Sequence, residues 1–147
     1  KVSKSIGYIE GAGDVLPDLL RQIGYQVSLL KKDDVTVDHL MQFDAIILGV
    51  RAFNTVDWLA YKNQELFDYC FKGGTVIVQY NTNRNLVTQE IAPYPLLLSR
   101  DRVSVEAAPV RILEPRHRSM NFPNKIIILF SNEFSASKFI IYIIPKR

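Results

Sequence analysis

The fold is decided by an apolar run in the first half of the chain, Asp44-Ala45-Ile46-Ile47-Leu48-Gly49-Val50. Consecutive apolar side chains with no polar alternation are typical of a strand that is buried on both faces, as in a parallel sheet. Similar apolar runs predict three more strands, at residues 5–9, 26–30 and 75–80. The sequence up to residue 80 therefore predicts an α/β fold built on a parallel sheet.

Helical spacing of apolar residues separates these strands. We expect Asp14 to cap the first helix and Gly24 to end it. Thr36 can cap a short second helix, and a third helix is expected from about Val56 to Phe71. This alternation predicts a parallel sheet with helices on both faces and right-handed crossovers, for which we take the strand order 2-1-3-4.

The alternating pattern ends after residue 81. Short apolar runs at residues 96–98, 103–105 and 110–113 predict strands joined by turns, and residues 115–123 predict an ordered loop. The segment Ile126–Ile144 is rich in Ile and Phe and predicts one or two strands. We therefore expect a β-rich C-terminal extension of the α/β fold.

Length and composition narrow the class of protein. The chain has 147 residues, 48% of them hydrophobic and 22% charged, which is typical of one globular domain. No apolar run approaches the ~20 residues of a membrane span, and no apolar segment follows the first residues as a signal peptide requires. We expect no membrane association and no signal peptide in this chain.

The charge is divided unevenly along the chain. Residues 1–99 carry nine basic and eleven acidic side chains, whereas residues 100–147 carry nine and four. The basic part has neither a recognition-helix pattern nor aromatic residues interleaved as in RNA-binding motifs, so nucleic acid is not an expected partner.

Cysteine and histidine are scarce. Cys70 is the single cysteine, which excludes an internal disulfide. We expect it late in the third helix as a buried thiol, because α/β enzymes place a nucleophile on a turn directly after a strand. His39 is expected on the surface, and His117 either in a loop or at a site edge. Their spacing fits no metal motif, so no metal site is expected.

A ligand site is expected at one edge of the sheet. Ligands of open parallel sheets bind beyond the carboxyl ends of the strands, where the strand order reverses. For the order 2-1-3-4 this point lies between the first and third strands. The loops at residues 10–14, 51–55 and 80–84 meet there and carry glycines, a carboxylate, arginines and amides. The alternative is that these residues only cap helices and close turns.

The first of these loops does not indicate a nucleotide cofactor. Gly11-Ala12-Gly13 begins a G-x-G-x-x-G pattern, but Leu16 occupies the position of its third glycine. A phosphate-binding P-loop is also missing from the sequence. A flavin or nucleotide carrier stays a third option, and no cofactor is expected.

Several sequence strings in a fixed order carry a family resemblance. They include Ile6-Gly7-Tyr8-Ile9, Leu20-Arg21-Gln22-Ile23-Gly24-Tyr25, Gly49-Val50-Arg51-Ala52-Phe53-Asn54-Thr55 and Val78-Gln79-Tyr80-Asn81-Thr82-Asn83. Over residues 5–126 the chain resembles the class I glutamine amidotransferase-like domain that follows the catalytic domain in large bacterial PIG-L (LmbE-type) deacetylases. The resemblance implies a three-layer α/β/α flavodoxin-like fold. We assign residues 1–126 to this domain and residues 127–147 to a divergent apolar tail of the same domain.

The resemblance implies binding without catalysis. Active amidotransferases carry a cysteine where this chain has Tyr80, and their later His-Glu pair is missing. Zinc-dependent deacetylation belongs to the family's other domain, whose His-Pro-Asp-Asp motif is also missing. The chain is therefore expected to be an accessory domain without catalytic residues, which binds a sugar or the deacetylase domain of its parent protein. A bacterial protein of the periplasm or cytoplasm is implied.

The resemblance and the sheet-edge argument together select the candidate ligand-binding residues. They all follow the carboxyl ends of predicted strands: Glu10, Gly11, Gly13, Arg51, Asn54, Tyr80, Asn81 and Asn83. The alternative function is a small hydrolase or transferase that uses the same polar cleft.

Overall fold

The computed structural model describes residues 4–100, 115–122, 125 and 142–144. The chain forms two compact units, one of residues 1–100 with 139–147 and the other of residues 101–138. The predicted domain boundary at residue 126 adjoins residues outside the described part, so it stays a prediction. Among the described residues, no helix combines the length and apolarity that crossing a bilayer requires.

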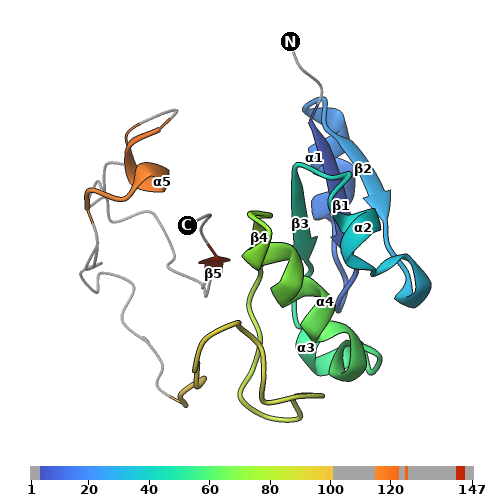
Figure 1. Ribbon diagram of the computed structural model, residues 1–147, viewed down its shortest axis with the longest axis vertical. Coiled ribbons are helices and arrows are strands. Elements are labelled where there is room, and N and C mark those ends of the chain that lie inside the picture. The colour runs from blue at the N-terminus through green and yellow to red at the C-terminus, as the bar shows by residue number, and fades with distance from the viewer. Residues whose placement is uncertain (1–3, 101–114, 123–124, 126–141, 145–147) are drawn as a thin grey trace. The chain divides into compact units, whose positions relative to one another are not determined.

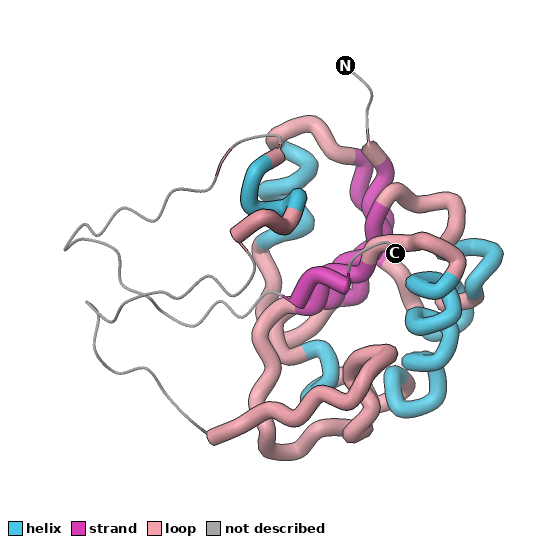
Figure 2. Tube along the Cα trace, turned by 60° about the vertical axis from the view of Figure 1, so that its left-hand side comes forward, coloured by secondary structure: helices cyan, strands magenta, loops and turns pink. Residues whose placement is uncertain are grey.

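The first unit contains a five-stranded sheet in the order β2-β1-β3-β4-β5 (Figure 1). Four strands run parallel: β1 (Ser5–Ile9), β2 (Gln26–Leu29), β3 (Ala45–Leu48) and β4 (Val76–Val78). The fifth, β5 (Tyr142–Ile144), pairs antiparallel with β4. Figure 2 shows the strands as one magenta band. The predicted parallel α/β sheet and its order 2-1-3-4 are confirmed, and the order reverses between β1 and β3.

Helices connect the parallel strands. In the first unit they are α1 (Leu16–Gln22), the 3-10 turn η1 (Lys32–Asp34), α2 (Val37–Leu40), α3 (Ala52–Thr55) and α4 (Leu59–Phe71). The predicted third helix corresponds to α4, which ends at Phe71 as expected and is followed by Gly73 at a positive φ of 92°. Only glycine adopts this conformation without strain, which explains the stop.

Two helix caps differ from the prediction. Helix α1 begins at Leu16 with Val15 at its N-cap, because the Asp14 side chain is bonded elsewhere. Thr36 does occupy the N-cap of α2 but makes no side-chain cap bond. Instead the Val37 N–H donates to Glu65 Oε2 of α4 at 2.9 Å, so a remote side chain satisfies this helix end.

The two faces of the sheet bury different clusters. Neighbouring residues of a strand point to opposite faces, and accordingly Ile46 and Leu48 belong to one buried cluster while Ile47 belongs to another. The first, here called the α4-face cluster, includes Leu59, Leu66, Phe67 and Tyr69 of that helix. The second, the α1-face cluster, consists of Ile6, Tyr8 and Ile47 with Leu16 and Leu20 of α1 packed against them.

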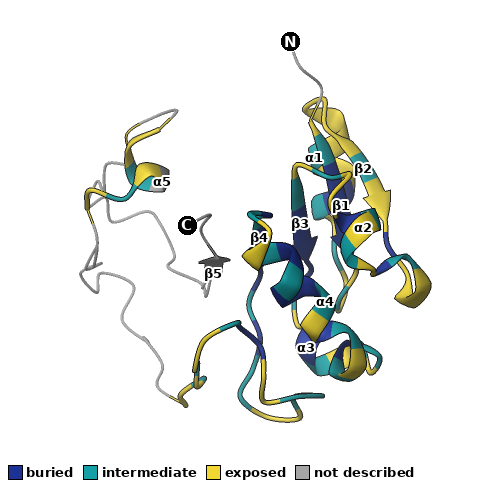
Figure 3. Cartoon of the chain, viewed as in Figure 1, coloured by how far each residue is buried: buried dark blue, intermediate teal, exposed yellow. Residues whose placement is uncertain are grey.

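The edge strand β2 is exposed over most of its length. Figure 3 shows it largely in yellow, beside the dark blue of β1 and β3. The strand predicted at 26–30 is present as the edge strand β2, and of these five residues Leu30 alone is buried.

The segment after β4 departs from the predicted strands. Residues 96–98 form no strand; Leu96 and Leu98 instead pack against the α4-face cluster. The strands predicted at 103–105 and 110–113 lie outside the described residues. The only described strand of the predicted β-rich extension is β5.

In the second unit, the predicted loop at 115–123 contains the short helix α5 (Arg118–Asn121). The Asn121 side-chain amide closes this turn by donating to the carbonyl oxygens of Pro115 and His117, at 2.8 and 3.1 Å. His117 lies in the turn directly before this helix, in agreement with the loop position predicted for it.

Candidate functional site

Three loops meet at the carboxyl edge of the sheet. The Ala12 N–H donates to the carbonyl oxygen of Val50 at 2.7 Å, and the Arg51 N–H donates to that of Tyr80 at 2.7 Å. The structure therefore brings together the loops after β1, β3 and β4, as the strand order predicts. Seven of the eight candidate residues lie in these loops, and the eighth, Asn54, lies in the short helix α3 that follows Arg51.

Asp14 is the centre of this edge, although the sequence analysis did not include it among the site residues. Its Oδ2 accepts from the Gly11 N–H at 2.9 Å and its Oδ1 from the Val50 N–H at 3.0 Å. The Tyr8 hydroxyl also hydrogen-bonds this carboxylate. A β-carbon on Gly49 would collide with the Asp14 carboxylate. Asp14 therefore holds two loops together and is not free to act on a substrate.

Tyr8, on β1, contacts the Asp14 carboxylate. Its side chain is fully buried, and its hydroxyl accepts a hydrogen bond from Gln79 Nε2 of the next loop at 2.8 Å. Burial, followed by the nearby Asp14 charge, raises the pKa of Tyr8 far above its usual value. Tyr8 therefore stays protonated at neutral pH and acts as a hydrogen-bond donor.

Two of the predicted ligand residues serve the loops instead. Asn81 Oδ1 accepts from the Phe53 N–H at 3.0 Å, while its Nδ2 donates to the Gln79 carbonyl oxygen at 2.8 Å. Asn54 Nδ2 donates to the carbonyl oxygens of Thr82 and Arg84, and its Oδ1 accepts from the Thr82 N–H at 2.9 Å. Both asparagines therefore close turns, which is the alternative given in the sequence analysis.

Arg51 and Glu10 present exposed charges at the same edge. Arg51 adopts a left-handed backbone conformation, with φ 58° and ψ 27°, which is uncommon for a residue with a side chain. Glu10 lies 3.5 Å from the ammonium group of Lys31 in an exposed ion pair. Gly13 is exposed, with a positive φ of 73° and open space where a β-carbon would be. The left-handed backbone of Arg51 is strained because the residue has a side chain, and backbone strain is concentrated at functional sites.

The remaining three candidate residues are all half-buried. They are Tyr80, Asn83 and Gly11, and a β-carbon on Gly11 would collide with the carbonyl oxygen of Val50. Gly11 is thus required by the close approach of two loops, and Tyr80 and Asn83 can still contribute to a surface.

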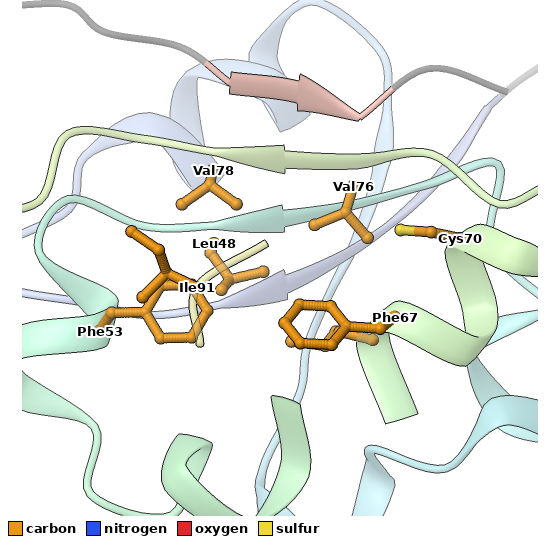
Figure 4. A pocket seen from close by; sticks show the side chains of 8 residues that line it. Leu48, Phe53, Phe67, Cys70, Val76, Val78 and Ile91 are labelled. Atoms are coloured by element: carbon orange, nitrogen blue, oxygen red, sulfur yellow. The ribbon is translucent and has the colours of Figure 1, made fainter. Parts of the chain in front are cut away.

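Cys70 lies late in α4, as predicted, but it is half-buried and not fully buried. It is on α4 among apolar side chains of the α4-face cluster, including Leu48, Phe67 and Val76 (Figure 4). Burial raises the pKa of its thiol to about 11. A thiol with this pKa is a poor nucleophile at neutral pH.

His39 differs from the expected surface residue. It is half-buried, its Nδ1 lies 2.8 Å from the carbonyl oxygen of Asp34, and its ring meets Phe43 edge-on at 5.4 Å. It thus helps to pack α2 against its neighbours. In the described part of the chain, no group of three His, Cys, Asp or Glu side chains is placed to hold a metal ion.

Comparison with known proteins adds no relative. No protein family model, curated protein or solved structure matches the chain. The function is therefore argued from the chain's own residues and from the resemblance of its sequence strings.

Proposed function

We propose that this chain is a non-catalytic binding domain that takes a small polar ligand of the sugar class at the carboxyl edge of its sheet. The proposal includes a three-layer flavodoxin-like arrangement and an accessory role in a PIG-L-type deacetylase-related protein. The observation that carries it is how the polar side chains at this edge divide. Asp14, Asn54 and Asn81 bond the loops to one another, whereas Arg51 and Glu10 are exposed.

This division favours binding over hydrolysis or group transfer. A catalytic base or nucleophile must be free to reach the substrate and must have a pKa suited to its task. Asp14 accepts hydrogen bonds from two backbone N–H groups and contacts a tyrosine hydroxyl that stays protonated. Tyr80 occupies the place where the resemblance puts the amidotransferase nucleophile. These residues build a rigid edge and supply no reactive group.

The exposed groups suit a ligand with several hydroxyl or amide groups. The Arg51 guanidinium supplies donors in a fixed planar geometry, and the Glu10 carboxylate supplies acceptors. The backbone at Gly13 can be approached closely because no side chain covers it. A sugar is a small uncharged molecule with several hydrogen-bond donors and acceptors. It can therefore hydrogen-bond both the Arg51 guanidinium and the Glu10 carboxylate.

The layered arrangement is supported by the two helices over the sheet. Leu16 and Leu20 of α1 pack on the α1-face cluster, while Leu66 and Phe67 of α4 belong to the α4-face cluster. This places one helix on each face in the first unit.

A thermal-shift screen of the whole chain tests the proposed function. N-acetylated sugars, nucleotides and flavins are compared, and we expect stabilisation by an N-acetylated sugar, because a ligand that binds only the folded state raises Tm. The Arg51→Asn variant removes the guanidinium but keeps a residue that tolerates the left-handed conformation. It should lose most of this shift.

The control is Lys72→Gln, which removes an exposed cation at the C-cap of α4 and should leave the shift unchanged. Stabilisation by a nucleotide or flavin alone would contradict the proposal. Stabilisation by no compound would favour docking of a partner domain in place of ligand binding. An equal sugar shift in Arg51→Asn would move the site away from this edge.

A further inference from the structure

A second candidate site lies along α4, in a groove of about 400 Å³. None of its lining residues belongs to the three carboxyl-edge loops. One wall is α4 and the other is the segment at residues 89–96. The volume is within the ~300–1,000 Å³ of small-molecule sites and is far larger than a bare ion needs.

The second wall is anchored, so the groove exists before a ligand binds. Asn63 Nδ2 of α4 donates to the carbonyl oxygen of Glu90 at 3.0 Å, and this asparagine is buried. Next to Glu90, Ile91 and Ala92 are buried, and Ile91 belongs to the α4-face cluster. The segment is thus held against α4 by a hydrogen bond and by apolar packing.

Aromatic rings line the groove at two depths. Phe67 is 6% exposed and lies at its floor, whereas Phe71 is 69% exposed and Tyr94 is 45% exposed at its rim. Exposed aromatic side chains around a concave site offer their ring faces to a ligand. These faces carry partial negative charge, which attracts cations.

The carboxylates at the groove are negative, and so are the faces of the aromatic rings. Among the described residues that line the groove, Glu90 is the one that carries a charge, and none is a lysine or arginine. Gln64 in the lining donates from Nε2 to Asp68 Oδ1 at 2.8 Å, which places a second carboxylate beside it. Phe67 and Phe71 also belong to the C-terminal part of a 13-residue helix, where the helix dipole favours positive charge.

We propose that this groove binds an organic cation of the substituted-ammonium class. The ring faces of Phe71 and Tyr94 take the alkyl groups and the charge together, and Glu90 supplies the counter-charge. An anionic ligand would meet no cation among the described residues that line the groove. A neutral sugar would leave Glu90 without a positive partner, so this site is distinct from the proposed sugar site at the carboxyl edge.

Calorimetric titration of the whole chain tests this proposal with choline as the probe. We expect choline to bind at least tenfold more tightly than its uncharged isostere, in which carbon replaces the quaternary nitrogen. The affinity should fall as salt is added, because the interaction includes a charge pair near the surface. NMR chemical shifts of the Phe71 and Tyr94 backbone amides should move on titration.

Two variants identify the groove as the site. Glu90→Gln keeps the shape of the side chain and should weaken choline binding severalfold, and Phe71→Leu should do the same by removing a ring face. Asp33→Asn is the matched control, since it removes an exposed carboxylate on η1 without touching the groove. Both groove variants alter exposed side chains, and thermal unfolding checks that they fold.

Three results would overturn the proposal. The first is equal binding of choline and its isostere. The second is unchanged choline affinity in Glu90→Gln and Phe71→Leu. The third is no heat and no shift change at millimolar choline. Movement of the Phe71 and Tyr94 signals by N-acetylglucosamine, with none by choline, would identify the groove as a sugar site.

Discussion

The two faces of the sheet are stabilised in different ways. Among the described residues, the α4-face cluster contains fifteen buried residues and the α1-face cluster three, so the described apolar burial is greater on the α4 face. On the α1 face the buried Tyr8 is hydrogen-bonded to polar groups of two loops. The comparison indicates that one face stabilises the fold and the other orders the loops of the candidate site.

Helix α1 illustrates the difference. Leu16 and Leu20 pack against the sheet, but the stripe one position earlier, Val15 and Leu19, is 70% and 49% exposed. Each step along a helix turns the side chain by about 100°, so one stripe faces the sheet while the other leaves it. On α4, by contrast, Leu66 and Phe67 are both buried.

The largest effect is expected from a pair of leucine substitutions that compares the faces. Leu66→Ala should lower the free energy of unfolding by about 2–5 kcal/mol, because it leaves a cavity in the α4-face cluster. Leu20→Ala on the α1 face should cost less, about 1–2 kcal/mol, since that side chain packs on the smaller cluster and is only half-buried. Urea unfolding measures both. Equal losses would remove the distinction between the faces.

A smaller loss is expected for Asp14→Asn. The asparagine places an NH₂ group against a backbone N–H that now donates to a carboxylate oxygen, so we expect a loss of about 1–3 kcal/mol. Asp18→Asn is the matched control on the exposed side of α1, with an expected change within about 0.5 kcal/mol. Thermal unfolding measures both variants. If Asp14→Asn is as mild as Asp18→Asn, the carboxylate does not hold the loops.

Tyr8→Phe should cost about 0.5–1.5 kcal/mol at neutral pH, because Gln79 and Asp14 each lose a partner. The stability of the protein at alkaline pH gives a second test of the Tyr8 hydroxyl. The pKa of Tyr8 is raised in the folded state, so its stabilisation is complete below pH 10 and is lost as the pH rises above 10. One proton corresponds to a slope of about 1.4 kcal/mol per pH unit.

Denaturant unfolding above pH 10 should therefore show a shallower slope for Tyr8→Phe than for the wild type. The buried Tyr69, whose pKa is also raised by burial, should keep part of the slope. Tyr61→Phe is the control, because that side chain is 81% exposed and should leave the slope unchanged. An unchanged slope in Tyr8→Phe would mean that the hydroxyl already titrates near its usual pKa.

The smallest effect concerns reactivity. Burial raises the pKa of Cys70 from its usual value near 9 to about 11, so its thiolate fraction at pH 8 is roughly a hundredfold lower than in the unfolded chain. Alkylation with iodoacetamide, followed by mass spectrometry, should be slow in the folded protein and fast in urea. Similar rates in both would place the thiol at the surface.

Much of the fold was predictable because its signals are local. The strand at residues 5–9 has the predicted bounds, and α4 ends at Phe71, its predicted last residue. The strand order 2-1-3-4 was assumed for the predicted parallel sheet, and the structure has this order. The misplaced strand at 96–98 shows the limit: a short apolar run fits a strand or a loop packed on a core, and only packing distinguishes them.

The candidate site was predicted as a place but not as a set of roles. The three loops meet where the strand order reverses, as expected. Asp14 was interpreted as a helix cap because capping depends on residues nearby in the sequence. The Val50 N–H that donates to Asp14 is 36 residues away, and the Phe53 N–H that donates to Asn81 is 28 residues away.

By itself, the sequence predicted the four parallel strands, most of the helices between them and the edge where the polar loops gather. Those features depend on the spacing of apolar residues and on glycines that end helices. Only the tertiary structure decided which polar groups are occupied and which are exposed, as with Asn81 and Arg51. The physical reason is that a hydrogen bond depends on distance in space, and its partner can come from anywhere along the chain.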